Sequence, residues 1–265
     1  MNKLKFYISQ AFQTFNQMEM RILPGNIAFF FVLAIVPCIT IVLLIGSYFG
    51  ISIDSVISLI RSFLPSEASN LIVDAISGKG FDTSVGAFSL IALFSASNAT
   101  YAVITASNTL YQISNRDVLK DRIKSVVLLF ILLWLIVFLM IVPMFGEKIL
   151  SFFHSNAIMD EIRFIYHILK WPLTIFLIYM NLKLIYTIAP SKKIRSSSTT
   201  YGAIFTTVIW TVVTAIFSYY LKHFANYNVI YGNLSSIIIL MMWLYIISYV
   251  FVMGIAINAT NLNEI

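Results

Sequence analysis

Long stretches without a charged side chain constrain this 265-residue chain more than any other feature. Five such stretches contain 22 to 41 residues, and they lie between Arg21 and Asp54, Asp82 and Arg116, Lys124 and Glu147, Arg195 and Lys222, and Lys222 and Glu264. A helix needs about 20 apolar residues to cross the hydrocarbon core of a bilayer. Each stretch is therefore long enough to form a membrane span.

Composition agrees with this interpretation, because 60% of the residues are hydrophobic and only 11% are charged, against about 25% charged residues in soluble domains. We therefore predict an all-α fold, a polytopic transmembrane helical bundle of about six spans that forms a single domain over residues 1–265. The expected span near 168–188, the fourth in chain order, contains Lys170 and Lys183 near its ends, where long stems can carry ammonium groups to the interface. The expected spans lie near 26–49, 84–112, 125–146, 168–188, 201–221 and 230–259.

Short amphipathic segments accompany the predicted spans. Apolar residues recur at helical spacing over residues 1–22, which predicts a helix in the cytoplasmic interface. Pro24 and Gly25 are expected to end that helix before the first span begins. Residues 53–64 and 71–76, and a shorter piece over 148–163, are expected to form helices on the external side.

Lysine and arginine positions predict the orientation. If loops are assigned to alternate sides, 11 of the 17 Lys and Arg residues fall on the side that holds both ends of the chain. Cytoplasmic loops collect these residues, so both termini are expected in the cytoplasm. The net charge of +6 is explained by this pattern and by anionic lipid headgroups, and a nucleic-acid partner is not expected.

Polar side chains distinguish the second span from the others. Several of them follow helical spacing and form one stripe that ends at a basic residue on the cytoplasmic side, namely Ser95, Asn98, Thr105, Asn108, Gln112 and Arg116. Exposing such groups to lipid costs free energy, so the stripe either hydrogen-bonds neighbouring helices or lines a substrate path. Tyr231 and Asn258 of the last span are added to the candidate path. Pro37 is the expected kink in the first span.

Motifs for soluble-type catalysis are missing. His154, His167 and His223 are scattered without a partner at metal-ligand spacing, and Cys38 is the only cysteine. The sequence contains no nucleotide-binding glycine loop and no carboxylate at the centre of a span. We therefore expect no enzyme activity, no cofactor, no metal site and no nucleotide hydrolysis by this chain.

Four segments, at 28–37, 108–116, 190–203 and 227–259, resemble the YihY/BrkB family of bacterial inner-membrane proteins. The stretch 227–259, YNVIYGNLSSIIILMMWLYIISYVFVMGIAINA, is similar to the C-terminal signature of that family, and the segments at 28–37, 108–116 and 190–203 are similar to other family motifs. The resemblance implies six spans in the bacterial cell membrane and connects the chain with envelope integrity. The family's old label, ribonuclease BN, does not fit the residues present. Ala256 stands where many relatives have glutamate.

Two functional hypotheses follow. The first is an exporter or flippase for an amphiphilic or anionic envelope molecule, with Asn98, Asn108 and Asn258 around a hydrated path. The second is a non-transporting membrane scaffold or regulatory subunit in envelope maintenance, in which the polar stripe only joins helices. Expected partners are membrane lipids, a lipid or anionic amphiphile as substrate, and copies of the same chain in a homo-oligomer.

Overall fold

All the regular secondary structure in the part of the chain that the structure describes is helical, which confirms the predicted all-α class. The computed structural model describes residues 18–48, 54, 57–58, 60–61, 69–70, 73, 85–114, 117–152, 158–223 and 231–262. Within these ranges the long helices are α2 (Met18–Tyr48), α5 (Val85–Leu110), α6 (Val118–Phe152), α7 (Ile158–Ile188), α8 (Thr200–His223) and α10 (Ser235–Leu262). The short 3-10 turn η1 (Gly232–Leu234) leads directly into α10.

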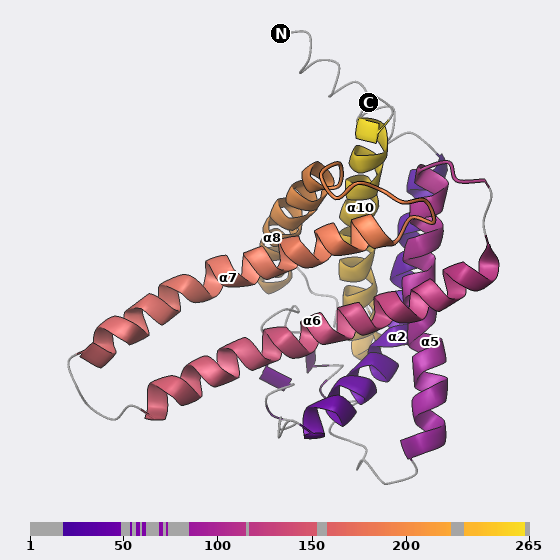
Figure 1. Ribbon diagram of the computed structural model, residues 1–265. Helices are drawn as coiled ribbons and strands as arrows, with labels where there is room; N and C mark the ends of the chain where they lie inside the picture. The colour runs from indigo at the N-terminus through magenta and orange to yellow at the C-terminus, as the bar shows by residue number, and fades with distance from the viewer. Residues whose placement is uncertain are drawn as a thin grey trace, which may run out of the picture.

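Four of these helices form an upright bundle, and two cross it obliquely. Figure 1 shows α2, α5, α8 and α10 running roughly alongside one another, with α6 and α7 laid across them. The C-terminal end of α6 and the N-terminal end of α7 extend away from the bundle to the left of that view. α2 packs against both α5 and α10, and α8 packs against α10 and α7. The core therefore lies where α6 and α7 cross the bundle.

Three of the helices contain stretches that are long and apolar enough to cross a membrane, within the part of the chain that could be searched. These stretches are Met18–Ile35, Thr200–His223 and Ser235–Thr260, and Pro172–Ile188 is a shorter apolar helix. Large apolar side chains of α8, among them Ile204, Val208 and Ile216, are exposed. A helix with apolar residues on all sides suits a lipid environment better than water. The count of six spans stays a prediction.

Two expected helix boundaries are corrected by the structure. α2 continues through Pro24 and Gly25, where a break was expected, and membrane helices tolerate proline because neighbouring groups satisfy the freed carbonyl. The external piece expected over 148–163 is divided between the end of α6 and the start of α7. Residues 1–17 of the predicted interfacial helix lie outside the described residues, as do most of 53–64 and 71–76.

A pair of glycines brings α8 and α10 into close contact. A Cβ atom built on Gly202 overlaps the backbone carbonyl oxygen of Gly254 and the side-chain amide of Asn258. A Cβ built on Gly254 overlaps the hydroxyl groups of Thr206 and Tyr186. The Gly202 backbone N–H donates to Asn258 Oδ1 over 2.8 Å. Small residues allow membrane helices to approach closely and to form such hydrogen bonds.

We expect Gly202→Ala to destabilise the protein by about 1–3 kcal/mol, because the added methyl group overpacks a contact made by backbone atoms. The measurement is thermal unfolding of the purified protein in detergent. The matched control is Val208→Ile, which adds one carbon atom to an exposed side chain of the same helix and is expected to change little. Equal melting temperatures for wild type and Gly202→Ala would contradict the close contact.

Candidate functional site

A buried polar junction joins the end of α5, the start of α6 and the segment after α7. Asn108 is fully buried and Asp121 is only 4% exposed. Asn108 Nδ2 donates to Asp121 Oδ2 over 3.1 Å and to Ser191 Oγ over 2.7 Å. The Ser191 hydroxyl donates to Asp121 Oδ1, and its backbone N–H donates to Asn108 Oδ1 over 2.7 Å. Both oxygens of Asp121 and both polar atoms of Asn108 are therefore satisfied.

Local sequence explains how the junction forms. α5 ends just beyond Asn108, and Gln112 then takes a positive φ of 53° in the turn that follows. Asp121 lies in the first turn of α6, where a carboxylate interacts favourably with the N-terminal end of the helix dipole. α7 ends at Ile188, and Pro190 prevents its continuation because it lacks a backbone N–H. The next backbone N–H, that of Ser191, is thus available to Asn108.

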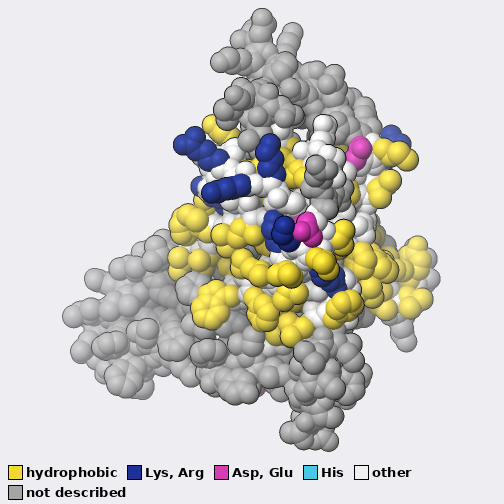
Figure 2. Space-filling view, turned by 45° about the vertical axis from the view of Figure 1, so that its right-hand side comes forward, with side chains coloured by type: hydrophobic (Ala, Val, Ile, Leu, Met, Phe, Trp, Pro, Cys, Tyr) yellow, Lys and Arg dark blue, Asp and Glu magenta, His cyan; other side chains and the backbone are white. Residues whose placement is uncertain are grey.

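Two cations lie beside the junction. Lys124 Nζ donates to the Pro190 carbonyl oxygen over 2.8 Å. Burial lowers the pKa of the Lys124 ammonium, and the nearby Asp121 carboxylate opposes that shift. Arg122 Nη1 donates to Asn98 Oδ1 over 2.8 Å. Figure 2 shows Lys and Arg side chains gathered on the upper part of one face, above a broad band of hydrophobic side chains.

A cavity of about 160 Å³ lies at the centre of the described bundle. All six long helices contribute to its wall, whose residues are Ile27 and Phe31 of α2, Thr100 and Val103 of α5, Leu128, Leu132 and Leu135 of α6, Ile178, Asn181, Leu182 and Ile185 of α7, Trp210 of α8, and Leu244, Ile247, Ser248 and Phe251 of α10. The wall is almost entirely apolar. A cavity of similar size lined by apolar side chains stays dry and accepts a small hydrocarbon.

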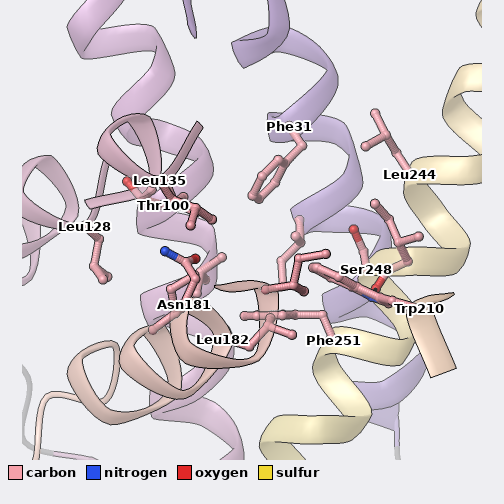
Figure 3. Close-up of a pocket in the computed structure, with 16 residues that line it drawn as sticks. Phe31, Thr100, Leu128, Leu135, Asn181, Leu182, Trp210, Leu244, Ser248 and Phe251 are labelled. Atoms are coloured by element: carbon pink, nitrogen blue, oxygen red, sulfur yellow. Dashed lines mark hydrogen bonds between the residues drawn. The ribbon is translucent and has the colours of Figure 1, made fainter. Parts of the chain in front are cut away.

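Few polar groups line the cavity, and two of them, Asn181 and Ser248, form no hydrogen bond with the described residues. In Figure 3, Asn181 and Thr100 lie on one side of it, and Ser248 and Trp210 lie across from them. The Thr100 hydroxyl donates to the Ser125 carbonyl oxygen over 2.6 Å, and Trp210 Nε1 donates to the Ile247 carbonyl oxygen over 2.7 Å. Asn181 is 9% exposed and makes no hydrogen bond with the described residues. Its amide is therefore available to an occupant of the cavity.

The structure divides the sequence-predicted path residues among different places. Asn98 and Asn108 contact α6, whereas Asn258 belongs to the contact between α8 and α10. Ser95 and Thr105 are half-buried on α5, Gln112 is exposed beyond its end, and Arg116 lies outside the described residues. Tyr231 is exposed immediately before η1 and is separated from Asn258 by 27 positions, or roughly 40 Å of helix.

Pro37, the expected kink, lies inside α2. Figure 1 shows the C-terminal part of that helix inclined to the rest of it. The Pro37 residue is half-buried and is not among those that line the cavity. A role for the kink in function stays a prediction.

Four residues important to this region were not singled out from the sequence, namely Asp121, Lys124, Asn181 and Ser191. Asn181 carried a usable signal, because it is an amide inside the apolar stretch 172–188. Asp121 is an acid among basic residues next to a span, which is a weaker signal. Ser191 had no such signal, since its hydroxyl and its backbone N–H meet their partners only in the tertiary structure. Across the described residues, no group of three or more His, Cys, Asp or Glu side chains is arranged to hold a metal ion.

We expect Asp121→Asn to lower the free energy of unfolding by roughly 2–3 kcal/mol, because one carboxylate oxygen becomes an NH2 group, which cannot accept the buried hydrogen bond that Asn108 or Ser191 donates to that oxygen. The measurement is the melting temperature in detergent. Asp117→Asn is the matched control, since Asp117 is exposed and its hydrogen bond to the Lys120 backbone N–H suits asparagine equally well. If the two variants lose equal stability, the junction does not stabilise the fold as described.

Comparison with known proteins places the chain in a family. The sequence matches the family described as Virulence factor BrkB over residues 11–264. It is 29% identical to a Bacillus subtilis protein named "Putative ribonuclease-like protein YfkH", over 96% of this chain and 94% of that relative. UPF0761 membrane proteins of Coxiella burnetii and Haemophilus influenzae are 35% and 33% identical to it over 82 residues, about 30% of each relative. No solved structure matches.

The family match covers nearly the whole chain and confirms the resemblance inferred from the C-terminal stretch and the other motifs. The relatives named as membrane proteins agree with the apolar helices described above. The chain therefore belongs to the Virulence factor BrkB family and is a membrane protein.

Proposed function

We propose that this protein moves an anionic amphiphile across the bilayer, as an exporter or flippase, without hydrolysing a nucleotide itself. The observation that supports the proposal best is the central cavity, whose wall is built by all six long helices and contains the amide of Asn181, which has no hydrogen-bond partner among the described residues. An apolar wall with very few available hydrogen-bonding groups matches a molecule that has a hydrocarbon body and a polar head.

The cavity favours hydrocarbon over a free ion. Moving a charge into apolar surroundings without a counter-charge is costly, and the described wall contains no charged side chain. Apolar chain segments gain free energy at about 25 cal/mol per Å² of surface removed from water. We therefore assign the hydrocarbon part of the substrate to the cavity and a polar group near it to Asn181.

The exposed cations support an anionic headgroup. Lys192, Lys193 and Arg195 are exposed in the connection between α7 and α8. Basic residues next to apolar spans attract anionic lipids, at about 1 kcal/mol for each residue near the surface. In the proposed cycle, these residues concentrate the substrate at the membrane surface before its hydrocarbon part enters the bundle.

The proposal includes six crossings of the bacterial cell membrane with both termini in the cytoplasm. α8 supports one crossing, because Tyr201 and Tyr220 are exposed near its two ends. Their 19-residue separation corresponds to about 28 Å of helix, close to the thickness of the hydrocarbon core. Tyrosine is enriched at both membrane interfaces. The basic connection before α8 then lies on the cytoplasmic side.

Cysteine labelling tests this topology. In a Cys38→Ser background, we expect Tyr231→Cys to react with an impermeant maleimide on intact cells, because it lies on the external side. Ser197→Cys, in the exposed connection between α7 and α8, is expected to react only after permeabilisation. The opposite pattern would show that the orientation is inverted.

Lipid movement tests the activity. We expect the purified protein in liposomes to move fluorescent phosphatidylglycerol between leaflets without nucleotide. Asn181→Leu is expected to slow this movement by about tenfold, because the substrate's polar group then loses a buried partner. The measurement is the accessibility of the fluorescent lipid to an external reducing agent over time.

Met180→Leu is the matched control for Asn181→Leu, since Met180 is the neighbouring residue and is exposed. It is expected to leave the rate unchanged. Failure of the wild-type protein to move either labelled lipids or anionic solutes would refute the proposal. Equal rates for wild type and Asn181→Leu would remove Asn181 from the mechanism.

A non-transporting scaffold is the second candidate function. It is favoured by the contacts of Asn98 with Arg122 and of Asn108 with Asp121 and Ser191, because these amides join helices. A scaffold would leave lipids in place in the liposome assay and would co-purify with a stable partner. Movement of phosphatidylglycerol that depends on Asn181 would exclude this candidate.

A further inference from the structure

Arg122 carries a positive charge without a counter-ion in the described structure. Its guanidinium lies 4.4 Å from the centroid of the Phe94 ring and 5.6 Å from that of Tyr101. Nη1 donates to Asn98, but Nη2 is covered and has no hydrogen-bond partner. The adjacent carboxylate of Asp121 is already used by Asn108 and Ser191. A guanidinium has five N–H donors, so most of its donor capacity is unused.

The surroundings of Arg122 are apolar and exposed. Helical spacing places Leu119, Arg122, Ile123 and Val126 on one face of α6, and the three apolar members of this set are exposed, Ile123 to 68%. Phe94 of α5 covers one face of the guanidinium and is itself 63% exposed. The cation therefore lies within an apolar surface rather than within a hydrated polar one.

We propose that Arg122 binds the phosphate group of an anionic glycerophospholipid whose acyl chains lie against the apolar face of α6. Arginine is suited to this group, because its planar fork of N–H donors matches phosphate oxygens in pairs. Access requires the Phe94 ring to rotate aside, which its exposure permits. The acyl chains cover Ile123 and Val126, and the phosphate supplies the negative charge that the described residues do not.

A membrane lipid explains the surface better than a free phosphate ion. A soluble anion would neutralise Arg122 but would leave Leu119, Ile123 and Val126 in contact with water. A phospholipid satisfies both features at once, since its charged and apolar parts are joined in one molecule. Lys120, at the same end of the helix, does not form such a site, because its side chain is highly exposed and already paired with Asp117 over 3.0 Å.

This site is separate from the proposed transport path. Arg122 and the exposed residues around it do not line the central cavity. The lipid is held on the outer surface of α5 and α6 whether or not the protein moves lipids. Binding measured on Asn181→Leu is therefore expected to equal that of wild type, even where lipid movement is lost.

Binding is tested on the purified full-length protein in detergent, by thermal unfolding with added lipid and by native mass spectrometry. We expect phosphatidylglycerol to raise the melting temperature by several degrees, with phosphatidylcholine and inorganic phosphate having little effect. Arg122→Gln is expected to weaken the apparent affinity for phosphatidylglycerol by about tenfold or more, because it removes the charge-assisted hydrogen bonds. Lys120→Gln, the matched control, is expected to keep the wild-type affinity.

Unchanged affinity in Arg122→Gln overturns the proposal, and so does an equal loss in Lys120→Gln, which would indicate diffuse attraction to the basic surface. A response to inorganic phosphate as large as that to the lipid would assign the site to a soluble anion and overturn the lipid assignment. If Arg122→Gln does not fold, the same measurements are made on Arg122→Lys. We expect Arg122→Lys to bind phosphatidylglycerol more weakly than wild type, because an ammonium group cannot contact two phosphate oxygens in parallel. Equal affinity of Arg122→Lys and wild type overturns the proposal.

Discussion

The hydrogen-bonded junction of Asn108, Asp121 and Ser191 is the contact on which the arrangement of α5, α6 and α7 depends. These residues come from three segments, and Ser191 is 83 positions from Asn108 and 70 from Asp121; each polar group uses the others as partners. A buried polar network rigidifies a structure when every member is satisfied and destabilises it when one member is not. The crossing of α6 and α7 over the bundle begins at this junction, so the junction also determines the helices around the cavity.

The cavity is apolar, whereas the Lys and Arg side chains near it are charged, and the proposed function depends on both. The cavity wall is apolar apart from a few groups such as the Asn181 amide, whereas the beginning of α6 and the connection between α7 and α8 are rich in lysine and arginine. Lipids combine the same two characters in one molecule. Arg122 differs from the other cations because it lies in an apolar surface, where a charge without a counter-ion is least stable.

Much of the secondary structure was predictable from the sequence, whereas the partners of the polar residues were not. Charge-free stretches such as 196–221 locate helices well, because a membrane helix must satisfy its own backbone and exclude charge. Helical spacing likewise identified Asn98 and Asn108 as polar residues on one helix. It did not show that Asn108 meets an acid from α6 and a serine that follows α7, because such contacts depend on how distant segments cross.

The sequence by itself determined the membrane class of the protein, its helical fold and its family. Local composition is sufficient for the first two conclusions, since hydrocarbon imposes the same requirements on every span, and the family follows from the C-terminal stretch 227–259 and the other motifs. Only the tertiary structure decided that Asn108 is buried in a junction, that Asn258 supports a glycine contact and that Asn181 lines a cavity. The physical reason is that an amide can bond a neighbouring helix or remain available to a ligand, and the geometry of its surroundings alone determines which occurs.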